Sequence, residues 1–178
     1  MIEPPLPEGE PAPSLADPHE LLEGHLDFCR STLLRKARAL SEEQLRTSVL
    51  PSGWTPLELI RHLTHVERRW LCWGFEAEPV PEPWGDRGPG GSAEDPWRVP
   101  AEMSVERVLA DFAEQRLRSR EISGGAPLDQ RARVGGRFTT ETETPTLAWT
   151  LFHMLQEYAR HVGHLDVVVE LAGAGTGE

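Results

Sequence analysis

The sequence is poor in cysteine and in basic residues, and each shortage excludes a class of protein. Cys29 and Cys72 are the only cysteines and form no CxxC pair, so we expect neither a disulfide framework nor a thiolate zinc site. The 29 acidic residues outnumber the 18 basic ones, and the formal net charge of −11 argues against binding to nucleic acids or anionic membranes. Small molecules or proteins are therefore the expected partners.

Long apolar runs are also missing. No stretch of about 18 apolar residues could form a membrane span, and the first residues, 1–5, carry neither the basic nor the apolar segment of a signal peptide. We therefore expect a cytoplasmic protein. Lys36 is the only lysine, whereas Gly and Pro number 16 each, and this bias is typical of a bacterial genome rich in G and C.

The length of 178 residues suits one domain with its own hydrophobic core. We expect a flexible, Pro-rich arm at 1–14, a single helical domain at 15–173 and a flexible tail at 174–178.

Capping signals predict where the first helices begin. Asp17 before Pro18 opens a helix that runs to about residue 40, and Ser41 with Gln44 forms a capping box for a short extra turn. A second capping box, Thr55 with Glu58 around Pro56, predicts a helix from 56 to about 73 that ends near 74.

Two more helices follow. Ser104 caps a helix that runs to about residue 122, and Thr144 before Pro145 predicts a last helix that reaches about 172 and is stopped by Gly173. Four long amphipathic helices without a strong strand pattern predict an all-α protein, a four-helix bundle with long irregular loops after the second and third helices.

The loop after the second helix, residues 76–102, is rich in Pro and Gly and contains Trp84 and Trp97. It is too long for a simple connector. It could be a functional lid or binding loop, or an ordered surface excursion without a functional role.

Two histidine-bearing stretches, residues 60–67 and 157–164, carry the clearest chemical signal. Glu157 and His161 lie four residues apart and so project from one helix face, the spacing that can hold one metal ion. His62, at the edge of its own helix's apolar stripe, could supply a third ligand and leave a coordination position open, as catalytic sites do.

Plainer interpretations stay open for each histidine. A single His at the border of an apolar stripe is usually hydrogen-bonded and structural, and Glu157 with His161 could be a surface pair. We interpret His19, His25 and His153 as structural. His65 and His164 each lie one turn from a proposed ligand and could support the site or face a substrate.

These motifs resemble the DinB-like superfamily, particularly its branch related to the minicircle protein and to mycothiol-dependent maleylpyruvate isomerase. One match is the stretch 53–56, Gly-Trp-Thr-Pro, followed by His62 in LELIRHLTHVERRW. The other is the stretch 157–164, EYARHVGH, where the family has a metal-binding dyad followed by Gly and a polar residue. Glu157 departs from the two-His dyad of many members but is similar to the isomerase branch.

The resemblance implies a four-helix fold and a divalent metal, zinc or nickel, held by His62, Glu157 and His161. It also implies activation of a low-molecular-weight thiol such as mycothiol, or in other branches of water, at the open metal position.

Three functions follow as hypotheses. The first is a divalent-metal-dependent thiol transferase or isomerase acting on a small molecule, with His65, Arg160 and His164 around the metal ligands. The second is a hydrolase that uses the same three ligands to activate water. The third is a non-catalytic stress-related or interaction protein with structural histidines. Exposed apolar bundle faces also make a homodimer plausible.

Overall fold

The computed structural model describes residues 6–81 and 98–174, and within them the ordered elements are helical. The helices are α1 (Pro18–Arg38), α2 (Glu42–Leu45), α3 (Pro56–Glu67), α4 (Val105–Gly124) and α5 (Leu147–Leu171). A π-helix, η1 (Arg68–Phe75), continues α3, and a 3-10 turn, η3 (Glu141–Glu143), precedes α5. The described residues contain no strand, only an isolated bridge between Arg131 and Thr146.

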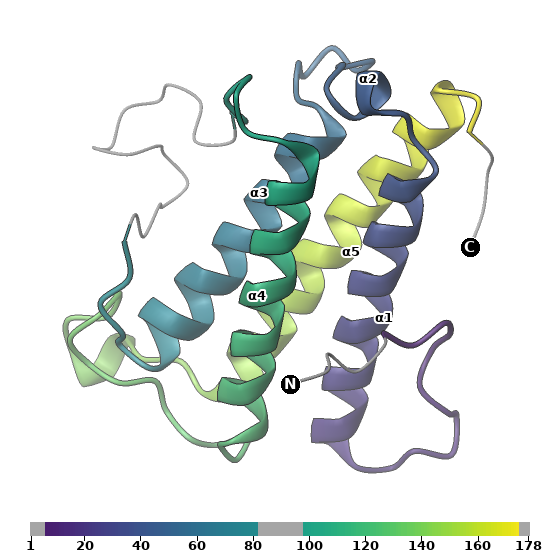
Figure 1. The fold of residues 1–178 in the computed structure, drawn as a ribbon. Coiled ribbons are helices and arrows are strands. Elements are labelled where there is room, and N and C mark those ends of the chain that lie inside the picture. The colour runs from purple at the N-terminus through teal and green to yellow at the C-terminus, as the bar shows by residue number, and fades with distance from the viewer. Residues whose placement is uncertain (1–5, 82–97, 175–178) are drawn as a thin grey trace.

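Four long helices form the bundle, as the sequence predicted (Figure 1). α1 packs along α5 and α3 packs along α4, while α3 also contacts α5. Leu26 of α1, Leu63 of α3, Phe112 of α4 and Leu151 of α5 are fully buried where the helices meet. The core thus fixes α3 and α5 side by side, and these two helices carry the paired histidine stretches.

The predicted caps are confirmed at four helix starts. Asp17 accepts from the backbone N–H groups of His19 and Glu20 at 2.9 Å each, and Ser104 accepts from Arg107. The reciprocal capping boxes at Ser41 and Thr55 are both present. The second box matters most, because the start of α3 sets the phase of its histidines.

The predicted start of the last helix was wrong by two residues. Its N-cap is Thr146 rather than Thr144, and helical geometry begins at Leu147. Residues 144–146 are extended because they pair with the preceding loop: the Ala132 N–H donates to the Pro145 carbonyl at 2.9 Å, and the Leu147 N–H donates to the Gln130 carbonyl at 2.8 Å. Tertiary hydrogen bonds therefore override the local Thr-Pro signal.

The loop after α4 folds back onto the π-helix. The Arg137 N–H donates to the Trp73 carbonyl at 3.1 Å, and the Arg133 N–H donates to the Phe75 carbonyl at 2.9 Å. A β-carbon on Gly136 would lie 2.0 Å from the Trp73 carbonyl oxygen, so this close approach requires glycine.

Part of the predicted organisation lies outside the described residues. This applies to residues 1–5, to 175–178 and to most of the predicted lid, including Trp84 and Trp97. The described end of the arm packs on α1, where Pro11 contacts Gly24. No helix within the described ranges is long and apolar enough to cross a membrane.

Candidate metal centre

Three potential metal-ligating side chains converge between α3 and α5. His62, Glu157 and His161 each offer one ligand atom, and these atoms all lie within 4.8 Å of one another. The His161 Nε2 atom is 3.3 Å and the His62 Nε2 atom 3.9 Å from Glu157 Oε2. The two imidazole rings stand edge to face, with centroids 4.7 Å apart. The structure therefore brings together the same three residues that the sequence spacing singled out.

Local sequence explains how each side chain reaches this point. The capping box at Thr55 starts α3, and His62 follows two turns later on the side that packs against α5. Glu157 and His161 are one turn apart on α5 and so share a face. Two packed helices hold all three, which places the cluster on rigid elements rather than on a loop.

Burial and charge set the protonation state of the cluster. The neighbouring His62 ring, assisted by His161 and His153, lowers the pKa of Glu157 to about 2, although partial burial acts the other way. Burial and the nearby His62 ring lower the pKa of His161, which is only 4% exposed, to about 4. At neutral pH the carboxylate is therefore ionised and the His161 imidazole neutral, which are the forms that bind a cation.

His153, for which the sequence predicts a structural role, lies next to this cluster on α5. Its Nε2 atom is 3.8 Å from Glu157 Oε1, whereas His62 and His161 approach the other oxygen, Oε2. Its ring stacks on Trp149 at an interplanar angle of 4° and contacts Trp70 at 4.3 Å between centroids. The spacing 153, 157, 161 places three groups on one α5 face and was the signal that could have identified it.

Aromatic rings border the cluster at its other end. Trp54, from the Gly-Trp-Thr-Pro motif, contacts His161 at 5.6 Å and His164 at 5.3 Å between ring centroids. His164 is exposed and its ring lies 5.7 Å from that of His161. His164 therefore lies beside the cluster and is open to solvent, and its role around the metal ligands stays a prediction.

The other two predicted outer residues lie differently. Arg160 is exposed on α5. His65 lines a cavity between α3 and α4, whereas the His62 cluster lies between α3 and α5. A role for Arg160 or His65 around the metal ligands stays a prediction. His19 and His25 lie on α1 and are not members of the cluster.

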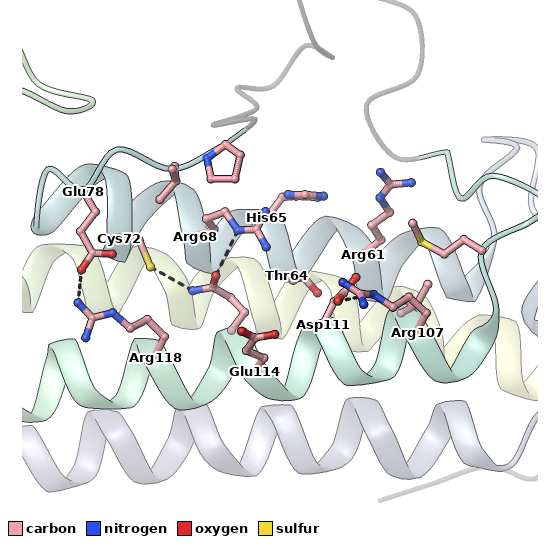
Figure 2. A pocket seen from close by; sticks show the side chains of 15 residues that line it. Arg61, Thr64, His65, Arg68, Cys72, Glu78, Arg107, Asp111, Glu114 and Arg118 are labelled. Atoms are coloured by element: carbon pink, nitrogen blue, oxygen red, sulfur yellow. Dashed lines mark hydrogen bonds and ion pairs between the residues drawn. The ribbon is translucent and has the colours of Figure 1, made fainter.

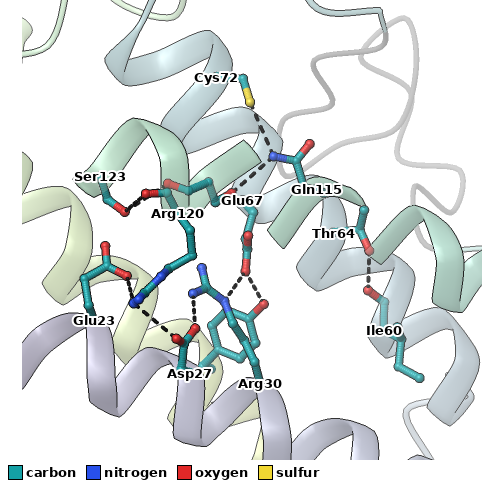
Figure 3. Close-up of polar contacts among 12 residues, drawn as sticks. Glu23, Asp27, Arg30, Ile60, Thr64, Glu67, Cys72, Gln115, Arg120 and Ser123 are labelled. Atoms are coloured by element: carbon teal, nitrogen blue, oxygen red, sulfur yellow. Dashed lines mark hydrogen bonds and ion pairs between the residues drawn. The ribbon is translucent and has the colours of Figure 1, made fainter. Parts of the chain in front are cut away.

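A buried polar network fixes α5 beneath the cluster. Glu67, the last residue of α3, accepts from Arg30 Nε at 2.9 Å and from the Tyr158 hydroxyl, so it ties α1, α3 and α5 together. Arg30 also pairs with Asp27 at 2.8 Å (Figure 3). Tyr158 follows Glu157 directly, so this network sets the rotation of the α5 turn that carries the candidate ligands.

The donor set fits a divalent transition metal. Two imidazoles and one carboxylate form an established catalytic zinc shell with a free position, and imidazole also suits nickel. The ligand atoms are close enough for modest side-chain adjustments to place one ion among them. That the three residues bind a metal stays a prediction.

Comparison with known proteins identifies a related family. A family model described as Mycothiol-S-transferase (MST) matches residues 21–173, from the first turn of α1 to the glycine after α5. The match therefore includes all three clustered residues. None of the curated proteins matches the chain.

Proposed function

Because the chain belongs to the mycothiol S-transferase family, within the DinB-like superfamily, we propose that it transfers a low-molecular-weight thiol, mycothiol in the first instance, to an electrophilic small molecule. The observation that carries this proposal is the convergence of His62, Glu157 and His161 from two helices of the matched region.

These three side chains are the proposed ligands of a zinc or nickel ion. When bound, a divalent ion supplies Lewis acidity that lowers the pKa of a thiol at its open position and so favours the nucleophilic thiolate. Glu157 contributes negative charge, and the neutral His161 imidazole contributes a nitrogen donor without a prior proton loss.

Residues around the ligands have separate proposed roles. His164 is exposed beside His161, so its imidazole is positioned to accept the proton that the thiol loses. His153 faces the other side of Glu157 and would hold that carboxylate in its ligating orientation. Trp149, 51% exposed and stacked on His153, offers an apolar surface beside the site for the electrophile.

The test is a transfer assay with metal-depleted protein, mycothiol and a chromogenic electrophile. We expect activity to return when zinc or nickel is added, to require the thiol, and to be absent in His161→Ala. The same electrophile incubated with metal-loaded protein but without thiol measures hydrolysis. Turnover without thiol would favour the hydrolase, and equal thiol transfer by the metal-depleted protein would overturn the proposed mechanism.

A further inference from the structure

A second site candidate lies on the other side of α3, in a cavity of about 550 Å³ between α3 and α4 (Figure 2). This volume lies within the range of small-molecule sites. Buried polar side chains, including Thr64 and Gln115, line it, and arginines surround them. None of the three candidate metal ligands lines this cavity.

Four arginines and three carboxylates, Glu78, Asp111 and Glu114, line the cavity, so its lining carries a slight positive excess in an acidic protein. Arg61 and Arg68 reach it from α3 and η1, and Arg107 and Arg118 reach it from α4, so four of the chain's 18 basic residues gather here. Arg107 is neutralised by Asp111 at 2.9 Å, and Arg118 pairs with Glu78 and Glu121.

Arg68, unlike Arg107 and Arg118, is held by a neutral amide rather than by a carboxylate. Its Nε donates to Gln115 Oε1 at 3.3 Å, and among the described residues no carboxylate lies within ion-pair distance of its guanidinium. Gln115 is itself fixed, because its Nε2 donates to Ser119 Oγ at 3.2 Å and to Cys72 Sγ at 3.3 Å. Within residues 6–81 and 98–174, a buried amide therefore orients the arginine and no carboxylate neutralises it, so its remaining N–H donors can serve an anion.

His65 lies between Arg61 and Arg68 along the helix, and its surroundings disfavour the protonated imidazole. Burial and then the positive charges of Arg68 and Arg61 lower the pKa of His65 to about 3. The imidazole is therefore neutral at physiological pH and provides a hydrogen-bonding group without adding charge. The opposite wall carries Asp111 and Glu114 on α4 (Figure 2).

We propose that this cavity binds a small oxyanion, a carboxylate or a phosphate group, with Arg68 as its principal anchor and Arg61 and His65 beside it. Guanidinium pairs with both oxyanions in a two-point geometry, and a partly buried pair is screened less than a surface pair. The proposal is independent of the metal centre, because it uses no residue of the cluster at His62.

The test is a titration of the full-length ¹⁵N-labelled protein, followed by NMR, with malonate and with inorganic phosphate at constant ionic strength. We expect saturable shifts of the Arg68 Nε–H signal and of the Thr64 and His65 amides. Saturation with only one anion supports the proposal and identifies the oxyanion. The absence of saturable shifts with both anions would overturn it.

Three variants make the test specific. Arg68→Gln should weaken binding by about tenfold or more, since it removes a charge-assisted contact. Glu114→Gln should strengthen binding, because it removes a like charge from the opposite wall. Arg35→Gln, which makes the same charge change at an exposed position on α1, should leave the affinity within about twofold. Equal affinity in Arg68→Gln and the wild type, with both folded by circular dichroism, would refute the assignment of Arg68.

Discussion

Two partly or fully buried histidines make the metal-free protein sensitive to mild acid. Burial lowers the pKa of His161 to about 4 and that of His65 to about 3, whereas both titrate near 6.5 in the unfolded chain. As pH falls below about 6.5, the unfolded chain takes up protons that the folded protein does not, so the free energy of unfolding decreases.

Between about pH 6.5 and 4.5, each such histidine lowers the free energy of unfolding by at most about 1.4 kcal/mol for each unit by which the pH falls. Urea unfolding of chelator-treated protein across this range measures the slope, and His65→Gln should reduce it. A slope that is the same in His65→Gln and the wild type would contradict the buried, neutral state of His65.

A substitution of His153 tests whether metal affinity depends on residues that contact the ligands as well as on the ligands themselves. His153→Phe keeps a flat ring between Trp70 and Trp149 but removes the nitrogen that faces Glu157. We expect zinc affinity, measured by competition with a chelating dye, to fall by about ten- to a hundredfold. His161→Ala should lose zinc binding at this site altogether. Unchanged affinity in His153→Phe would show that His153 only packs there.

At the scale of single elements, the contact between the 133–138 loop and η1 depends on a glycine. Gly136→Ala would place a methyl group 2.0 Å from the Trp73 carbonyl oxygen, and the backbone must shift to relieve it. We expect a loss of about 1–3 kcal/mol in the free energy of unfolding.

Gly163→Ala is the matched control for this substitution. Nothing lies within 4 Å of a β-carbon at Gly163, which is exposed inside α5, so alanine should stabilise the helix by about 0.5–1 kcal/mol. Denaturant unfolding of both variants gives the comparison. Equal effects of the two substitutions would contradict the close approach at Gly136.

Disruption of the network that joins α1, α3 and α5 should lower the free energy of unfolding more than either glycine substitution. Arg30→Ala leaves the Glu67 carboxylate, which is fully buried, without its cation, and such a loss costs about 3–5 kcal/mol. Glu42→Ala breaks the exposed pair between Glu42 and Arg46 and should cost less than about 0.5 kcal/mol. Thermal or urea unfolding measures both. A loss below about 1 kcal/mol in Arg30→Ala would contradict a stabilising role for this network.

The sequence predicted those elements whose signals are local. The caps at Asp17, Ser41, Thr55 and Ser104 act within one helical turn and are confirmed. The start of α5 depends on pairing with residues 130–132, and no local signal carries that information. The π-helix η1 and the buried Arg30 likewise depend on tertiary contacts.

In the candidate site, too, some features follow from local sequence and others depend on how the helices pack. The spacing of Glu157 and His161 on one helix is local and was read from the sequence, whereas their distance from His62 required the packing of α3 against α5. The place of His65 could not be read from its own helix, because the cavity it lines is completed by α4. Its helical phase alone did not indicate which neighbouring helix it faces.

At the scale of the whole molecule, one bundle carries two chemically different regions on two sides of α3. The side toward α5 holds nitrogen and carboxylate donors, whereas the side toward α4 carries four arginines beside three carboxylates, in a protein with a net charge of −11. The all-helical fold and the DinB-like resemblance are confirmed. The homodimer, the cytoplasmic location and the lid stay predictions.

The most direct test of the central claim is X-ray absorption of the zinc-reconstituted protein in the absence of thiol. The account predicts one zinc per chain, with two imidazole nitrogens at about 2.0–2.1 Å, a carboxylate oxygen at about 2.0–2.2 Å and no sulfur. It also predicts that His161→Ala binds no stoichiometric zinc. A sulfur neighbour at about 2.3 Å, or an unchanged spectrum in His161→Ala, would show that zinc binds elsewhere and would contradict the claim.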